Sequence, residues 1–558
     1  MQKTCAIILF ILIATTVCSQ NPRYLITLQD KNPEDNPYSL EQPEKFLSSK
    51  AIERRTKQNI SYDSLDLPIA PLYIDSLLTT GVQIQNKSKW LNSIVAEIDS
   101  NMMNNLSEIS FVKEIKYLAP PKNSTKTTSK KGIQEYKQTK KDWHKKLQQD
   151  NINYGSTESQ IKLVNGHVLH ENGFKGEGKT IAVLDGGFNK VDEMPVFDSL
   201  WANEQIHETK NFEDKSSSVF KDHDHGTYVL SILGANLPDE LYGSAPKANY
   251  LLLRTEVTSS EYLVEEYNWI AAAEFADSAG ADIINSSLGY SEFDDSTQNH
   301  TYEDLDGETI PISKAAQIAA SRGMITVISA GNLGNNKWKY ITAPADAYDI
   351  LSVGASDQFG NYVSFSSKGP STDGRIKPEV SAQGQAIFYQ NTDSMIVNGS
   401  GTSFSAPIIS GLAACLWQSK EESDYKDIIE TIIQSSHQVN NPDTLLGYGI
   451  PDFANAAEIE YSSSEEDKIT HKELKIYPNP FRDSFNIAIP DMSQQSEEIN
   501  IKIISVTGRV IYKQTDSTPL KNNTLIIDEL KNVSPGVYFI EIKYDKNSVL
   551  RKKIIKTQ

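Results

Sequence analysis

The sequence predicts an α/β protein, a parallel sheet with helices on both faces, preceded by a small α+β domain and followed by a β-sandwich. From about residue 152 to residue 457, apolar runs alternate with helical segments; the runs are residues 180–184, 250–253, 282–285, 325–329 and 350–354. Continuous apolar strands separated by helices form parallel sheets that are covered on both faces. A chain of 558 residues also leaves room for about three or four domains.

Shorter elements flank this central region. Residues 20–120 alternate strand-like runs, such as 24–28 and 93–98, with polar helical stretches, which predicts the α+β domain. The lysine-rich residues 121–151 and the polar residues 458–474 bury too little apolar surface to fold and are expected to be linkers. Residues 475–558 carry about five short alternating strands, among them 485–489, 499–504 and 537–542, which predicts the β-sandwich.

The first 19 residues have the pattern of a signal peptide. Lys3 precedes a short apolar run, and small residues allow cleavage after Ser19, although a lipoprotein signal that uses Cys18 stays an alternative. No later apolar stretch of about 18 residues follows, so we expect an exported protein without a transmembrane segment in the mature chain. The net charge of -19 disfavours nucleic acid as a partner. Only Cys415 remains in the mature chain, where it is expected to be a buried thiol.

Four segments of the central region carry reactive or polar side chains at the ends of elements. Asp185 ends an apolar strand, His225 precedes an apolar helical run, Asn332 follows another strand, and Ser403 opens a helix in a glycine-rich segment. An acid at the carboxyl end of a strand lies where open α/β sheets bind their ligands. Asp-Gly is also a common turn, so Asp185 alone favours neither interpretation.

Together the four segments supply what nucleophilic acyl transfer requires. The reaction needs a hydroxyl, a base, an acid that orients the base, and donors for the developing oxyanion. The backbone N–H of Ser403 is a second candidate donor beside the Asn332 side chain. The chain order Asp185, His225, Ser403 differs from the Ser, Asp, His order of α/β-hydrolases, and no Gly-x-Ser-x-Gly is centred on Ser403.

With these motifs, residues 152–457 resemble the catalytic domain of the subtilisin family. The resemblance implies a secreted serine endopeptidase with the triad Asp185, His225 and Ser403, and with Asn332 as oxyanion donor. It also implies that protein or peptide substrates bind at Ser287, Leu288, Gly289, Ala330 and Gly331. The chemistry would need no cofactor, and structural calcium is an option because subtilisin relatives bind it at varied places.

Three features depart from the family pattern or suggest other sites. Gly186 stands where the family usually has Ser or Thr, so a hydroxyl partner for Asp185 is expected to be missing. His223 and Asp224 could bind a metal, but a loop role is favoured because no partner cluster has ligand spacing. The acidic stretch of residues 292–306 could bind calcium, but without the spacing of a known loop a solvated insertion is favoured.

The flanking domains resemble parts of exported relatives. Residues 20–120 stand where the family has its propeptide, and the lysine-rich linker suits a processing region and a mere spacer equally well. Residues 475–558, with 476–480, 506–510 and 536–538 as motifs, resemble the C-terminal sorting domain of type IX secretion. This implies export through the periplasm and outer membrane of a Gram-negative bacterium by the type IX secretion machinery, to the medium or the cell surface. An ordinary β-sandwich binding module is the alternative.

A second function from another class remains open at this stage. The chain could be a catalytically silent surface-binding protein that keeps the subtilisin-like fold. The intact triad residues argue against this alternative.

Overall fold

The computed structural model describes residues 21–31, 36–122, 152–459 and, between 475 and 557, the strands with some adjoining residues. Two compact units divide the chain, residues 1–460 and residues 461–558. The predicted signal peptide lies outside the described residues. The same holds for all but the first two residues of each predicted linker.

A seven-stranded parallel sheet forms the centre of the first unit, in the order β13-β12-β11-β10-β5-β9-β6. The strands are β5 (Thr180–Asp185), β6 (Ile206–Asn211), β9 (Asn249–Arg254), β10 (Ile283–Ser286), β11 (Ile325–Ser329), β12 (Leu351–Ser356) and β13 (Val380–Gln383). The predicted parallel sheet is therefore confirmed, and each of the five apolar runs corresponds to one strand, within two residues at either end. The strand order reverses between β5 and β10, so their carboxyl ends flank the point where open sheets bind ligands.

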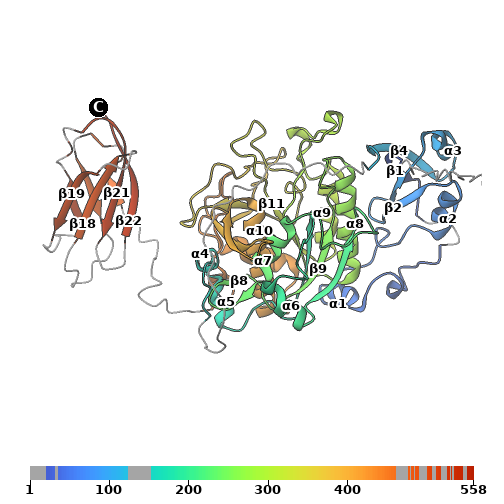
Figure 1. Cartoon of the computed structure of the whole chain (residues 1–558), viewed down its shortest axis with the longest axis horizontal. Coiled ribbons are helices and arrows are strands. Elements are labelled where there is room, and N and C mark those ends of the chain that lie inside the picture. Colours follow the sequence, from blue (N-terminus) through green and yellow to red (C-terminus); the bar gives the residue numbers. More distant parts are fainter. Residues whose placement is uncertain are drawn as a thin grey trace, which may run out of the picture. The chain divides into compact units, whose positions relative to one another are not determined.

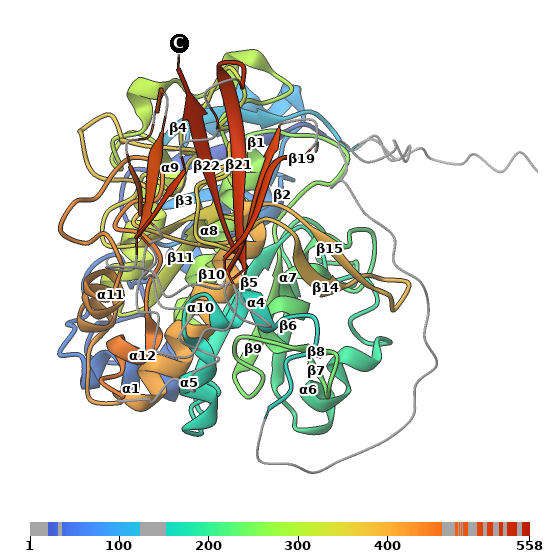
Figure 2. The same ribbon diagram turned by 90° about the vertical axis from the view of Figure 1, so that its left-hand side faces the viewer.

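Helices cover both faces of this sheet. Figure 1 shows α7 (His225–Gly234) and α10 (Thr402–Ser419) on one face, with α8 (Val264–Ala279) and α9 (Pro311–Ser321) on the face toward the N-terminal domain. Helix α10 is apolar nearly all round and is buried from Thr402 to Trp417. Smaller helices complete the unit: α4 (Glu158–Lys162), α5 (Gly166–Glu171), α6 (Asp198–Ala202), α11 (Tyr425–Gln434) and α12 (Phe453–Ala456). Two short antiparallel pairs, β7 (Asn236–Leu237) with β8 (Leu241–Tyr242) and β14 (Ile387–Gln390) with β15 (Ile396–Gly399), lie outside the main sheet (Figure 2).

The N-terminal domain is the predicted α+β unit. Its antiparallel sheet has the order β2-β3-β1-β4, formed by β1 (Arg23–Leu28), β2 (Gln83–Ser88), β3 (Ser93–Glu97) and β4 (Val112–Ala119). Helices α2 (Pro71–Thr79) and α3 (Met103–Ser107) share an apolar core with this sheet that includes Ile26, Leu77 and Ile94. Helix α1 (Ser49–Lys57) packs against α8.

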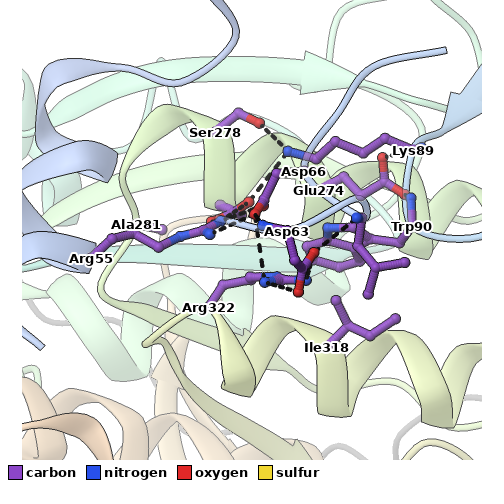
Figure 3. A network of polar contacts seen from close by, with 12 residues as sticks. Arg55, Asp63, Asp66, Lys89, Trp90, Glu274, Ser278, Ala281, Ile318 and Arg322 are labelled. Carbon is purple, nitrogen blue, oxygen red and sulfur yellow. Dashed lines mark hydrogen bonds and ion pairs between the residues drawn. The ribbon is translucent and has the colours of Figure 1, made fainter. Parts of the chain in front are cut away.

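A buried network of charges joins the N-terminal domain to α8 (Figure 3). Asp277 of α8 accepts from Arg54 at 2.6 Å, from Arg55 at 2.9 Å and from Lys89 at 3.3 Å, and its side chain has no exposed area. Glu274, one turn earlier, accepts from the backbone N–H of Lys89 at 2.8 Å. Burial by itself would raise the pKa of Asp277, but the three cations outweigh it and the pKa is lowered.

In a second part of the network the anion belongs to the N-terminal domain and the cation to the central domain. Asp63 of the N-terminal domain accepts two hydrogen bonds from Arg322, which follows α9, at 2.9 and 3.0 Å. Asp66 accepts from Arg55 and fixes its guanidinium in place. The domain contact thus contains cations and anions from both sides, which explains why α8 can bury Glu274 and Asp277.

The second unit contains two antiparallel sheets. One has the order β16-β17-β20, formed by β16 (Lys475–Tyr477), β17 (Phe485–Ala488) and β20 (Thr524–Ile527). The other has the order β19-β18-β21-β22, formed by β18 (Ile499–Ser505), β19 (Val510–Asp516), β21 (Gly536–Lys543) and β22 (Val549–Lys556). Phe485, Ile487, Ile503 and Ile540 belong to one apolar cluster, so the two sheets share a core. The sequence predicted about five strands because β16 and β20 are too short to show a clear alternation.

Candidate active site

An acid and an imidazole meet at the carboxyl end of β5. Asp185, the last residue of β5, is fully buried, and its Oδ1 accepts from Nδ1 of His225 at 2.8 Å. His225 begins α7, whose buried apolar residues fix the ring at the edge of the sheet. Because Nδ1 points at the carboxylate, Nε2 is the ring nitrogen left to exchange a proton. Burial would lower the pKa of His225, but the Asp185 carboxylate outweighs burial and the pKa is raised.

The glycine after Asp185 has a physical reason. A Cβ added at Gly186 would lie 2.8 Å from Nδ1 of His223, so the imidazole of His223 occupies the space of a side chain at position 186. Nδ1 of His223 accepts a long hydrogen bond from the backbone N–H of His225, at 3.4 Å. The N–H of Gly186 itself donates to Asp185 at 2.7 Å. A backbone donor therefore contacts Asp185, and a second histidine packs beside the pair.

Ser403 and Asn332 lie across the same cavity from His225. Ser403 is the second residue of α10, and its backbone N–H is in the first turn, where helices leave N–H groups without an internal partner. Oδ1 of Asn332 accepts from the backbone N–H of Thr402 at 2.8 Å and from its hydroxyl at 3.0 Å. Thr402 thereby fixes the orientation of the Asn332 side-chain amide, so that Nδ2 of Asn332 is the atom that can donate to a substrate. Thr402 has no role in the sequence prediction, because nothing in the motif shows which way the asparagine turns.

The hydroxyl of Ser403 is not bonded to the imidazole. It donates to the carbonyl of Ser287 at 3.2 Å, and the hydroxyl of Ser287 donates back to the carbonyl of Ser403 at 2.9 Å. Within the described residues no hydrogen bond joins Ser403 to His225. The His225 ring lies 6.2 Å from the ring of Phe404, the next residue of α10, so the two elements are in contact. Such bonds commonly tighten only when a substrate is bound.

One cavity of about 400 Å³ brings the predicted residues together. It is lined by Asp185, His225, Ser287, Leu288, Gly289, Gly331, Asn332 and Ser403, and also by His223, Glu256 and Thr342. Ala330 is the one predicted site residue that does not line it; its carbonyl accepts from the N–H of Thr342 at 3.2 Å. None of the described residues of the N-terminal domain lines this cavity.

Three carboxyl groups that the sequence prediction missed form one wall of the cavity. Oxygen atoms of Glu256, Glu261 and Glu265 lie within 4.8 Å of one another. Burial raises the pKa of Glu256 to about 7, while Tyr290 and Thr255 donate hydrogen bonds to it. These three residues offer the oxygen ligands that calcium prefers. Glu256 follows β9 by two positions, and only the parallel order of β9 and β5 places it near Asp185.

Three carboxylates of the acidic insertion bond within the loop, whereas Asp294 accepts the backbone N–H of Glu261 at 3.1 Å. Asp295 and Asp306 accept backbone N–H groups two or three residues ahead, and Asp304 accepts the N–H of Thr301. These bonds are the turn and capping contacts that short acidic side chains commonly make.

Cys415 is buried inside α10, where burial raises the pKa of its thiol, so it is an unreactive core residue as predicted.

The fold and the cavity define an α/β protein in which an acid, an imidazole and a serine, in that chain order, meet at the switch point of a parallel sheet. Residues 176–449 match the model of the subtilase family. Residues 23–135 match the Bacteroidota propeptide domain of the S8 peptidases, and residues 475–557 match a secretion-system C-terminal sorting domain. Residues 176–449 therefore form a domain of the subtilase family, and the sorting domain indicates export to the medium or the cell surface.

Three relatives illustrate the match. The chain is 27% identical to the thermophilic serine proteinase of Bacillus sp. (strain AK1), over 49% of this chain and 60% of the relative. It is 25% identical to the subtilisin-like protease SBT6.1 of Arabidopsis thaliana, over 56% of this chain and 28% of the relative. It is 28% identical to thermitase of Thermoactinomyces vulgaris, over 46% of this chain and 81% of the relative. The chain thus spans less than two thirds of the length of the first two.

Among the described residues, no helix has the length and apolar character needed to cross a membrane.

Proposed function

We propose that the chain is a secreted serine endopeptidase that hydrolyses peptide bonds through an acyl-enzyme intermediate. The observation that carries the proposal is the hydrogen-bonded pair of Asp185 and His225 facing a cavity that also contains Ser403 and Asn332. The subtilase match and the similarity to relatives named as proteinases support it.

The reaction follows from the roles that the side chains can take. The Ser403 hydroxyl rotates from Ser287 toward His225, gives its proton to Nε2 and attacks the peptide carbonyl carbon. His225 then passes the proton to the leaving amine, while Asp185 keeps the ring in the required tautomer. Nδ2 of Asn332 and the backbone N–H of Ser403 stabilise the oxyanion. Water repeats the sequence on the acyl-enzyme.

Substrate binding is proposed at the two segments beside Ser403. An extended peptide adds as a strand to the main chain at Ser287 and Gly289, with Leu288 between them. Gly331 forms the opposite side, and Ala330, which does not line the cavity, is proposed to take part only by positioning Gly331. Strand addition suits an endopeptidase because main-chain hydrogen bonds recognise any peptide, and only pockets for side chains select among them.

The flanking domains are proposed to serve folding and export. The N-terminal domain acts as a propeptide on α8 and α9, and the linker after it is the region of processing. The type IX secretion machinery is the proposed partner of the C-terminal domain, and it carries the chain across the outer membrane.

The chemistry itself is proposed to need no cofactor, with calcium as an optional structural ion at Glu256, Glu261 and Glu265. A chelator such as EDTA is then expected to leave the rate of peptide hydrolysis in the assay nearly unchanged at room temperature. Complete and immediate loss of hydrolysis on chelation, restored by calcium, would contradict this.

The nucleophile is tested with the full-length chain and its Ser403→Ala variant. The unaltered chain is expected to hydrolyse casein and to be labelled by a fluorophosphonate probe, whereas the variant does neither. Ser400→Ala is the matched control, because Ser400 is exposed three residues earlier and its hydroxyl, within the described part of the chain, accepts a hydrogen bond only from the N–H of Ala386. Equal labelling of Ser403→Ala would refute the assignment. A folded unaltered chain that neither labels nor hydrolyses would favour the silent binding protein.

A further inference from the structure

Part of the cavity that contains Ser403 is a pocket between two segments of the chain. Ser287, Leu288 and Gly289 form one side of this pocket, and Ser329 and Gly331 form the other. The two sides approach each other closely, because the Ser329 hydroxyl donates to the carbonyl of Leu288 at 3.4 Å. Thr342 lies where they meet. Its N–H donates to the carbonyl of Ala330 at 3.2 Å.

The Thr342 side chain fills the space between the two glycines of the pocket. A Cβ added at Gly289 would lie 2.1 Å from Oγ1 of Thr342, and one added at Gly331 would lie 2.9 Å from the same atom. Thr342 is only 3% exposed, and its hydroxyl makes no hydrogen bond to any described residue. No hydrogen bond within the described residues therefore accounts for this hydroxyl. The absence of side chains at Gly289 and Gly331 leaves the space that Thr342 fills.

Thr342 is held firmly in this position. Its neighbour Ala343 pairs with Tyr290 in both directions, N–H to carbonyl at 2.8 and 3.1 Å. Tyr290 in turn is buried and donates its hydroxyl to Glu256 at 2.6 Å. The end of the pocket is thus a fixed wall, which a bound side chain could displace only by breaking these bonds.

The geometry places one particular substrate side chain in this pocket. The Ser403 oxygen lies 3.2 Å from the carbonyl of Ser287, and the segment from Ser287 to Gly289 leads from there to Thr342. A peptide that pairs with this segment and offers its carbonyl to Ser403 directs the side chain of that same residue, on the N-terminal side of the cleaved bond, between Gly289 and Gly331. We infer that Thr342 is a specificity-determining residue that closes this pocket and restricts that side chain to small ones, namely glycine, alanine and serine. The inference rests on the proposed function.

The test measures kcat/KM of the full-length chain on peptides that differ only in the residue before the cleaved bond. Alanine and serine are expected to exceed leucine and phenylalanine by about tenfold or more, because a filled pocket discriminates by size. Thr342→Gly is expected to raise the ratio of phenylalanine to alanine by about tenfold or more. Thr342→Ser, which removes one methyl group, is expected to raise the ratio for leucine by a smaller factor.

Thr342→Val is the matched control, because valine keeps the volume of threonine and removes only the hydroxyl. It is expected to keep the order of preference of the unaltered chain. Active-site concentrations are set by fluorophosphonate titration, so partial misfolding of a variant does not change the ratios. A preference of the unaltered chain for phenylalanine, or unchanged ratios in both Thr342→Gly and Thr342→Ser, would overturn the inference. Loss of the size preference in Thr342→Val would overturn it as well.

The two proposals fail in different ways. If the unaltered chain labels and hydrolyses peptides without a size preference, the role of Thr342 is wrong and the proposed function stands. If it neither labels nor hydrolyses any peptide, the proposed function fails, and the inference about Thr342 fails with it.

Discussion

Glu256 is a buried carboxyl group whose charge affects the pKa of His225, the candidate base. Its charge is one of those that raise the pKa of His225, together with the larger contribution of Asp185. Because burial brings the pKa of Glu256 to about 7, the group changes its charge near neutral pH. The protonation of the two side chains is therefore linked.

Glu256→Gln is expected to shift the pH dependence of kcat/KM. The base acts in its neutral form, so activity rises as pH increases through the pKa of His225. Removing the negative charge of Glu256 lowers this raised pKa, so the acidic limb moves to lower pH. Profiles from about pH 5 to pH 9 on one peptide measure the shift. Asp222→Asn is the control, since Asp222 is an exposed carboxylate paired with Arg254. A limb that moves to higher pH would contradict the assignment.

Helix α10 presents Ser403 and is anchored by a close contact with the segment after β8. A Cβ added at Gly411 would lie 2.0 Å from the Ser244 hydroxyl, which donates to the carbonyl of Pro407 in α10 at 2.8 Å. Gly411 is thus required by packing, even though glycine is a weak helix former.

Gly411→Ala is expected to lower the thermal midpoint by a few degrees. Alanine gains about 1 kcal/mol of helix propensity. The overpacking against Ser244 costs about 1 to 3 kcal/mol and outweighs that gain. Scanning calorimetry in the Ser403→Ala background avoids self-digestion. Ser419→Ala, near the C-terminal end of the same helix, is expected to change the midpoint little. A midpoint raised by Gly411→Ala would show that the helix can move away from Ser244.

The sequence predicts strands well where apolar runs are long and buried. β5 and β11 match their predicted runs within one residue, because fully buried parallel strands carry continuous apolar residues. It predicts poorly what depends on contacts between distant segments. The packing of His223 against Gly186 and the bond of Thr402 to Asn332 require the folded chain, since neither partner marks the other in the sequence. The cluster of Glu256, Glu261 and Glu265 was not predicted for the same reason.

The contact between the N-terminal domain and α8 is decided by buried charges. Arg54 and Asp277 are 223 positions apart, so no local pattern could predict their pairing. The lowered pKa of Asp277 means that its stabilising effect is complete above the ordinary Asp pKa of 3.8 and is lost only as pH falls through the lower folded value. Mild acid between about pH 8 and pH 5 therefore does not loosen this contact through Asp277.

Asp277→Asn is expected to weaken the domain contact strongly. Removing one partner of a buried ion pair costs about 3 to 5 kcal/mol, because the remaining charges stay buried without compensation. In the full-length Ser403→Ala chain, hydrogen exchange of α1 and α8 is expected to accelerate and the thermal midpoint to fall. Asp349→Asn is the control, since Asp349 and Lys426 form an exposed pair worth at most about 1 kcal/mol. Equal effects of the two substitutions would show that the network does not hold the domains together.

The packing of His223 against Gly186 restricts the order in which the two positions can change. A serine introduced at 186 alone would collide with the imidazole, whereas a smaller residue at 223 makes room without a collision. A lineage that moves from glycine to serine after Asp185 is therefore expected to change position 223 first. Among homologues, serine or threonine at the first position should accompany a small residue at the second.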